Sequence, residues 1–200
     1  MNFIKKLRSL NLFLLFNYAI GFIYAKIFFK KAKLIRIPFY LRNEGQFIYD
    51  KGLTLAPNTL IEIFGEESIL QIGKNFTSYY NLHIGCCDQI SIGDNVLVAS
   101  NVYISDHQHG NYKNLDEYTT SVPFQEPVKR QILTKAVSIG DNVWIGEGAK
   151  ILPGTIIGNG SIIGAGSVVT KNIPENSISV GSPAKVIKFY SKSHKTWLDA

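Results

Sequence analysis

The most regular feature of the chain is a six-residue spacing of aliphatic residues. From Ile139 the sequence reads IGDNVW IGEGAK ILPGTI IGNGSI IGAGSV VTKNIP, so that isoleucine begins five of the six blocks and Val169 begins the sixth. A helix repeats about every 3.6 residues and a half-buried strand about every 2, so neither explains this period. A chain that turns a corner after each short strand does, with three blocks forming a triangular coil of about 18 residues. The pattern therefore predicts an all-β solenoid, a parallel β-helix.

The same six-residue spacing occurs earlier in the chain. Ile72, Ser78 and Ile84 follow it, as do Ile92, Val98 and Ile104, with two extra residues between the two sets. Looser repeats, LTLAPNTLIEI and SILQIG, precede them, while Gly and Asn occupy the expected corners. We therefore expect the β-helix to occupy residues 44–182.

The two ends of the chain do not follow the repeat. Residues 10–25, LNLFLLFNYAIGFIYA, carry no charge and predict a helix within an N-terminal segment, residues 1–43. This run is shorter than the roughly 20 residues that span a bilayer, and it ends in Lys26 without a cleavage pattern of small residues. After an exit strand, residues 183–200 no longer follow the six-residue repeat, and we expect them to form a short capping helix over the open end.

The charge distribution separates the N-terminal segment from the body. Residues 1–43 contain nine basic residues and no acidic one, so the remaining chain has 21 − 9 = 12 basic residues against 15 acidic ones. A body with net charge −3 argues against nucleic-acid binding. The basic and apolar N-terminal segment instead fits contact with the anionic inner face of a cytoplasmic membrane. Packing of this segment on the body or on a neighbouring subunit is the alternative.

The repeat stops between Ile104 and Ile139, where a polar excursion of residues 105–137 begins with SDHQHG. A loop this long in a compact repeat is typically functional or disordered. His107 and His109 stand at its start and are candidates for acid–base chemistry. Cys86 and Cys87 are adjacent, which predicts small core side chains in a reducing compartment and no disulfide framework.

Taken together, these motifs resemble the hexapeptide-repeat acyltransferases, most of all the bacterial O-antigen and capsule O-acetyltransferases. The resemblance covers about residues 35–190 and rests on IRIPFYLRNEG, IGDNVLVASNVYISDHQHG, NVWIG and GSPAKVIK. It implies a left-handed β-helix and a homotrimer with sites between subunits. It also implies direct acetyl transfer from acetyl-CoA to a sugar or glycan acceptor, which could be lipid-linked, without a metal.

The resemblance also assigns roles to individual residues. His107 matches the family's general base, which would take the proton of the attacking hydroxyl. Asn81 matches an acceptor contact, and we group His83, Asp106 and His109 with it, although Asp106 could also orient an imidazole. Positions along the acetyl-CoA track are matched by Trp144, Gly146, Ala165, Thr170, Lys171, Lys185 and Lys188. The lysines can supply charge for phosphates, but not the bidentate geometry of arginine.

Three alternatives stay open. An acetyltransferase of this kind could act on a small free sugar or on a nucleotide-sugar amine. His83, His107 and His109 could bind zinc in an enzyme similar to the β-helical carbonic anhydrases, because three imidazoles and a water form an adequate catalytic zinc shell. A β-helix could also be a non-catalytic scaffold, since fold alone does not decide function.

Overall fold

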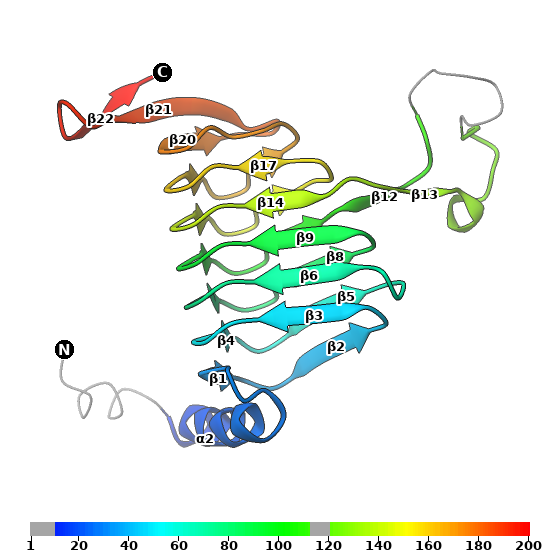
Figure 1. Ribbon diagram of the computed structural model, residues 1–200, viewed down its shortest axis with the longest axis vertical. Helices are drawn as coiled ribbons and strands as arrows, with labels where there is room; N and C mark the ends of the chain where they lie inside the picture. The colour runs from blue at the N-terminus through cyan, green and yellow to red at the C-terminus, as the bar shows by residue number, and fades with distance from the viewer. Residues whose placement is uncertain (1–10, 113–120) are drawn as a thin grey trace.

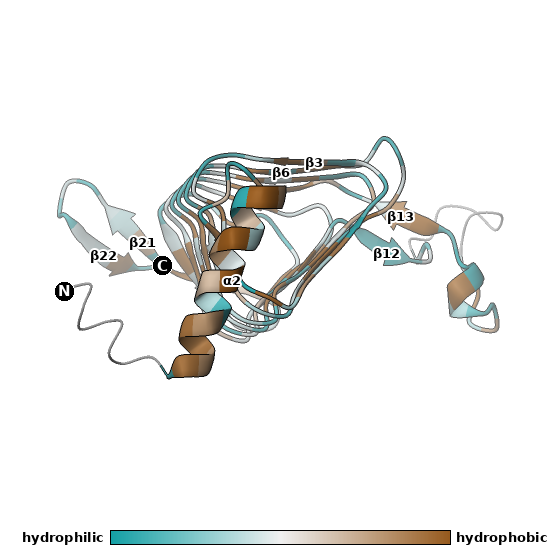
Figure 2. Ribbon diagram, turned by 90° about the horizontal axis from the view of Figure 1, so that it is seen from below, coloured by the Kyte–Doolittle hydropathy of each residue, from teal (hydrophilic) through white to brown (hydrophobic). Residues whose placement is uncertain are grey.

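The computed structural model describes residues 11–112 and 121–200, and most of these form a triangular parallel β-helix (Figures 1 and 2). One face is a nine-stranded sheet, with the order β1 (Leu34–Ile35), β4 (Thr54–Leu55), β7 (Thr77–Ser78), β10 (Leu97–Val98), β15 (Trp144–Ile145), β18 (Ile162–Ile163), β20 (Ser177–Val180), β21 (Lys185–Ser191) and β22 (Thr196–Asp199).

The other two faces are wholly parallel. The six-stranded sheet contains, from the N-terminal end, β2 (Phe39–Asn43), β5 (Thr59–Ile63), β8 (His83–Cys86), β11 (Tyr103–Ser105), β16 (Lys150–Ile151) and β19 (Val168–Val169). The five-stranded sheet contains β3 (Gln46–Tyr49), β6 (Ile69–Ile72), β9 (Gln89–Ile92), β14 (Val137–Ile139) and β17 (Ile156–Ile157). The predicted parallel β-helix is thus confirmed.

Stacked aliphatic side chains fill the interior. In the six-stranded sheet the register places Ile61 beside Ile84, Ile84 beside Ile104, and Ile104 beside Ile151. Each of these side chains is fully buried. Loss of one such side chain to alanine costs about 2–5 kcal/mol in a packed core, so this column holds the coils in register.

The corners between sheets are fixed by asparagine. Asn75, Asn95 and Asn142 have φ values of 57°, 58° and 56°, in the left-handed region that asparagine tolerates better than most residues. Their side chains also stack from coil to coil: Asn75 Nδ2 donates to Asn95 Oδ1 at 3.0 Å, and Asn95 Nδ2 donates to Asn142 Oδ1 at 3.2 Å. This amide ladder satisfies polar groups at a sharp bend.

The N-terminal helix α2 (Leu12–Phe28) lies across the first coil, over part of the N-terminal end of the prism (Figure 2). Gly21 allows close approach, because a Cβ there would lie 2.6 Å from the carbonyl oxygen of Ile35. The buried Arg36 guanidinium lies between the rings of Tyr18 and Tyr80, at 4.8 and 5.0 Å from their centroids. In the described part of the chain, no helix is long and apolar enough to cross a membrane.

Two expectations about the ends of the β-helix are wrong. Strands begin at Leu34, before the expected start at residue 44, because Ile35 already pairs in register with Leu55 and is fully buried. The expected C-terminal helix is absent: β21 and β22 form an antiparallel hairpin that extends the nine-stranded sheet. Residues 185–191, KVIKFYS, are rich in β-branched and aromatic side chains, and β21 pairs with the open edge of β20.

The excursion leaves the β-helix at the corner between the six-stranded and five-stranded sheets and projects outward (Figure 1). Its base is an antiparallel pair of β12 (His107–His109) and β13 (Ile132–Thr134), with a 3₁₀ turn η1 (Pro127–Lys129) beyond. Arg130 fastens the described part, donating to the Tyr112 hydroxyl at 2.8 Å and to the carbonyl of Gln125 at 2.9 Å. Residues 113–120 of the excursion lie outside the described residues.

Candidate active site

His107 lies near the start of the excursion, directly beyond the six-stranded sheet. Its imidazole lies over Gly85 of β8, where an added Cβ would come 3.0 Å from its Cε1. Nδ1 is 3.1 Å from the Ser105 hydroxyl and 3.3 Å from Asp106 Oδ1. With 15% of its side chain exposed, the ring is held in one orientation but remains open to a substrate.

The Asp106 carboxylate contacts Nδ1 of the His107 ring and orients it. Its side chain is fully buried, and its two oxygens accept hydrogen bonds from the backbone N–H groups of Cys87 and Asp88, each at 2.8 Å. Burial by itself raises the pKa of this carboxyl, but the hydrogen bonds from His107, Cys87 and Asp88 outweigh it and place the pKa below its ordinary value. Asp106 is therefore an ionised carboxylate at neutral pH.

This arrangement selects one tautomer of His107. A buried carboxylate and a hydroxyl at Nδ1 favour a proton on that nitrogen, which leaves the lone pair on Nε2. Among the residues that the structure describes, no hydrogen bond to Nε2 is formed. Nε2 is thus able to accept a proton from a bound hydroxyl, and Asp106 would stabilise the imidazolium that results.

A row of polar and aromatic side chains continues from His107 across the outer face of the six-stranded sheet. Glu62 accepts from or pairs with His83 Nε2 at 3.2 Å, and the ring of His83 meets that of Tyr103 edge-on at 5.2 Å. Phe64 meets the His107 ring edge-on at 6.3 Å between centroids, and the Arg42 guanidinium lies 4.6 Å above Phe64. Carboxylates, imidazoles and aromatic faces suit a sugar, which has both hydroxyls and apolar ring faces.

His83 was predicted from the sequence as an acceptor contact, whereas Arg42, Glu62, Phe64 and Tyr103 were not. They come from three coils and meet only because the register pairs Leu60 with His83 and His83 with Tyr103. Side chains two residues apart on one strand share a face, so a correct register would have identified them.

The other residues expected to contact the acceptor are placed differently. Asn81 lies at the opposite end of β8 from His107, with a φ of 60°, and donates to Asn101 Oδ1 at 2.8 Å as part of a corner ladder. Asp106 is buried beneath the ring and has no surface for an acceptor, so direct substrate contact is wrong and the orienting role fits. His109 is exposed on β12, and its carbonyl accepts from the Tyr112 hydroxyl at 2.7 Å.

Residues expected along the acetyl-CoA track fall partly on the nine-stranded sheet. Register aligns Trp144 with Ile162, Ile162 with Ile178, and Ile178 with Lys188, so these four form one column across successive strands. Trp144 is half-exposed and lines a shallow hollow of about 310 Å³ with Tyr79, Leu97, Ala99, Ser100 and Glu147. Gly146 and Ala165 lie at the adjacent corner, where a Cβ on Gly146 would approach the Ala165 nitrogen to 2.6 Å.

The remaining track residues lie elsewhere. Thr170 and Lys171 follow β19 at the corner from which the excursion leaves, on the side of His107. Lys185 is exposed on β21, and Lys188 on the same strand pairs with Asp199. The corner that carries His107 and the face that carries Trp144 lie on opposite sides of the prism (Figure 2). A single chain therefore does not bring its own His107 and Trp144 together.

The geometry does not assemble a three-histidine metal site. His83 pairs with Glu62, and in the described part of the chain the grouping of ligand atoms within 4.8 Å consists of Cys87, Asp106 and His107. Both oxygens of Asp106 are already bonded to backbone amides. Burial, followed by the negative charges of Asp106, Glu44 and Glu62, raises the pKa of Cys87 to about 11, so its thiol is protonated at neutral pH.

Comparison with known proteins agrees with this architecture. The profile of the bacterial transferase hexapeptide (six repeats) matches residues 136–171, and that of the hexapeptide repeat of succinyl-transferase matches residues 86–106. The chain is 37% identical over 172 residues to WbbJ of Escherichia coli (strain K12), a protein assigned as a lipopolysaccharide biosynthesis O-acetyl transferase, covering 86% of each chain. It is 34% identical over 171 residues to the galactoside O-acetyltransferase of the same organism, covering 79% of this chain and 78% of that one.

Solved structures give the same result. A maltose O-acetyltransferase from Clostridium difficile 630 superposes with a TM-score of 0.51 at 35% identity, over 74% of this chain and 65% of that one. A galactoside acetyltransferase in complex with coenzyme A has a TM-score of 0.50 at 31% identity, over 78% of this chain and 64% of that one.

The hexapeptide coils and these relatives together define an acyltransferase built on a hexapeptide-repeat β-helix. More narrowly, the chain belongs to the family of acetyl-CoA-dependent O-acetyltransferases. The sequence predictions of the fold, of the enzyme class and of acetyl-CoA as the acetyl donor are confirmed.

The contact between Asp106 and His107 predicts the effect of Asp106→Asn. We expect kcat to fall by about 10- to 1000-fold, because an amide favours the wrong imidazole tautomer and does not stabilise an imidazolium. Binding of acetyl-CoA, measured by calorimetry, should be unchanged. Equal kcat in folded Asp106→Asn and wild-type protein would exclude the orienting role.

The raised pKa of Cys87 predicts an unreactive thiol that takes no part in catalysis. At pH 8 the thiolate fraction is lower than for a free cysteine, so iodoacetamide should label Cys87 roughly 100-fold more slowly, with the rate rising toward pH 11. Cys87→Ser should keep most of the acetyltransferase activity. Rapid labelling at pH 8, or trapping of acetyl on Cys87, would contradict this prediction.

Proposed function

We propose that the protein transfers acetyl from acetyl-CoA to a sugar hydroxyl during synthesis of a bacterial surface polysaccharide, with His107 as general base. The hydroxyl oxygen attacks the thioester carbonyl while Nε2 of His107 takes the hydroxyl proton. The carbon–sulfur bond then breaks, the imidazolium returns the proton to the leaving thiolate, and the products are an acetyl ester and free CoA. The observation that carries this proposal is the His107 ring held by buried Asp106 beside a sugar-compatible row.

The nature of the acceptor rests on two supports. The Escherichia coli relative at 37% identity is assigned to lipopolysaccharide biosynthesis. The row from His107 to Tyr103 lies on the outer face of a sheet, where His83 and Glu62 keep 39% and 27% of their side-chain surface exposed, and such a face can accept one unit of a longer glycan. We place the reaction in the cytoplasm, at the inner face of the membrane where such glycans are assembled.

The separation of His107 from Trp144 supports a trimer with sites between subunits. The corner with His107, Thr170 and Lys171 on one chain would face the column from Trp144 to Lys188 on the next. That column spans three strand spacings, about 14 Å, which fits an extended pantetheine arm with Trp144 near the thioester and Lys188 toward the phosphates. Closed three-fold symmetry would repeat this arrangement three times.

His107→Ala tests the proposed base. We expect it to bind acetyl-CoA as the wild type does and to lose about 100- to 10,000-fold in kcat, because general-base catalysis contributes that much. His109→Ala is the matched control, since His109 is exposed on the same strand and should lose less than about 10-fold. Assays of the wild type with a lipid-linked glycan, a free sugar and a nucleotide-sugar amine identify the acceptor. Turnover of that acceptor by His107→Ala at the wild-type rate would exclude His107 as the base.

Mixed oligomers test where the site is assembled. His107→Ala and Trp144→Ala chains should each be inactive alone, but about a quarter of the interfaces in randomly mixed trimers would pair an intact His107 with an intact Trp144. Co-expression should therefore restore about a quarter of wild-type activity. No restoration in trimers shown by mass spectrometry to be mixed would place both residues in the same site of one chain.

A further inference from the structure

The outward side of α2 is an apolar surface that nothing in the described structure covers. Gly21 and Ala25 face the β-helix, whereas the opposite side carries exposed residues at helical spacing: Leu12, Phe13, Phe16, Phe22, Ile23 and Ile27. Leu12 is 85% exposed, Phe16 64% and Ile27 61%. Figure 2 shows this helix lying across the end of the prism with its side exposed along its length. An apolar surface of this size on a folded protein indicates a partner.

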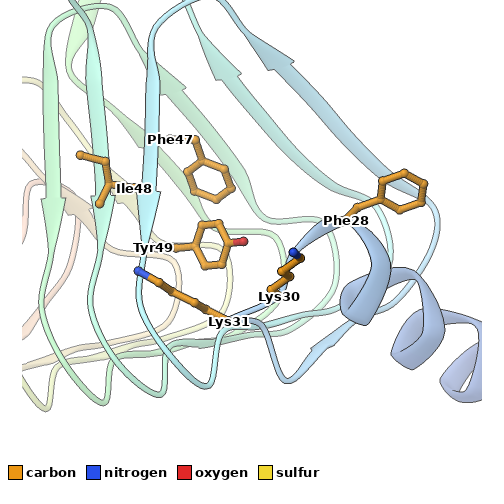
Figure 3. A pocket seen from close by; sticks show the side chains of 6 residues that line it. All are labelled: Phe28, Lys30, Lys31, Phe47, Ile48 and Tyr49. Carbon is orange, nitrogen blue, oxygen red and sulfur yellow. The ribbon is translucent and has the colours of Figure 1, made fainter.

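A hollow of about 450 Å³ opens beside the C-terminal end of this helix, lined by Phe28, Lys30, Lys31, Phe47, Ile48 and Tyr49 (Figure 3). Phe28 belongs to α2, and the last three residues belong to β3. Within the described ranges, neither Lys30 nor Lys31 pairs with a carboxylate. The hollow thus combines two uncompensated ammonium groups with an apolar floor, a chemistry that suits a phosphate carried on an apolar chain.

Charge decides between the two occupants that this surface could have. A second copy that met this surface with its own N-terminal segment would bring like charge against it, because residues 1–43 carry nine basic residues and no acidic one. Two such segments repel each other. An anionic lipid surface offers the opposite charge, and each lysine or arginine near such a surface strengthens binding.

We propose that α2 and the Lys30–Lys31 hollow form a docking site for an anionic phospholipid surface. The outward side of α2 lies in the headgroup region, and the hollow receives a headgroup phosphate. Gly21 and Ala25 pack the helix against the first coil, so it binds as an interfacial helix that lies in the plane of the membrane.

Docking through α2 fixes the distance between the membrane surface and the active site, a consequence that rests on the proposed function. The helix lies across the first coil, and β2, β5, β8 and β11 rise from it in successive coils of the six-stranded sheet. Three strand spacings separate β2 from β11, so His107 lies about 14 Å above the first coil. A sugar attached through phosphate to a membrane lipid would reach His107 at that height, whereas the headgroups themselves would not.

Vesicle flotation of the full-length trimer tests the docking site without any acetyl transfer. The vesicles contain either phosphatidylcholine alone or phosphatidylcholine with phosphatidylglycerol. We expect binding to the anionic vesicles and little to the neutral ones. Lys30→Gln with Lys31→Gln should weaken binding by about 10- to 30-fold. Phe16→Ser, Ile23→Ser and Ile27→Ser together should weaken it by at least about 10-fold.

Matched controls come from the opposite end of the β-helix. Lys192→Gln with Lys195→Gln removes two exposed lysines, and Ile187→Ser with Leu198→Ser removes two exposed apolar side chains, and both variants should bind as the wild type does. Acetyl-CoA binding by each variant shows that it is folded. The proposal is overturned if wild-type protein ignores anionic vesicles, if the controls weaken binding equally, or if the helix variant changes only the oligomeric state. Vesicle binding by a protein that lacks acetyltransferase activity would instead refute the proposed function alone.

Discussion

Every functional position in this protein depends on the inward column of aliphatic side chains. Ile61, Ile84, Ile104 and Ile151 lie in register on successive strands, and each is fully buried. A slip of one residue would turn this column to solvent and would move every outward side chain to the interior. The same constraint therefore places His83 beside Tyr103 and Trp144 beside Ile162, although those outward residues contribute little to the core.

The active site uses this rigid scaffold at the point where the repeat ends. Asp106 is a fully buried side chain at the start of the excursion, and the amides of Cys87 and Asp88 in the preceding coil fix its carboxylate. Its contact with Nδ1 transfers that rigidity to His107 across one peptide unit. A base on a mobile loop would lose effective concentration, whereas the imidazole of His107, the proposed base, is fixed by the coil below it even though the chain beyond it projects away.

The six-residue period was sufficient to predict the β-helix, and the break in that period was sufficient to locate His107. Register was not readable from the period alone, because Arg42, Glu62 and Phe64 belong to early coils with longer strands, where β2 and β5 have five residues each. The C-terminal hairpin was missed for a different reason. KVIKFYS follows no six-residue pattern, and its pairing with β20 is set by an open sheet edge that exists only in the folded chain.

Two departures from the repeat, α2 and the excursion, point in different directions. Helix α2 lies over part of one open end and presents apolar and basic residues along the axis of the prism, while the excursion projects sideways from the middle of the stack. If α2 binds a membrane, the number of coils between α2 and His107 sets the distance of His107 from the membrane surface. Adding or removing one coil between β2 and β11 would change that distance by about 5 Å. The repeat would then act as a spacer that matches the base to one sugar of a membrane-attached glycan, a selection that a pocket around a single sugar could not make.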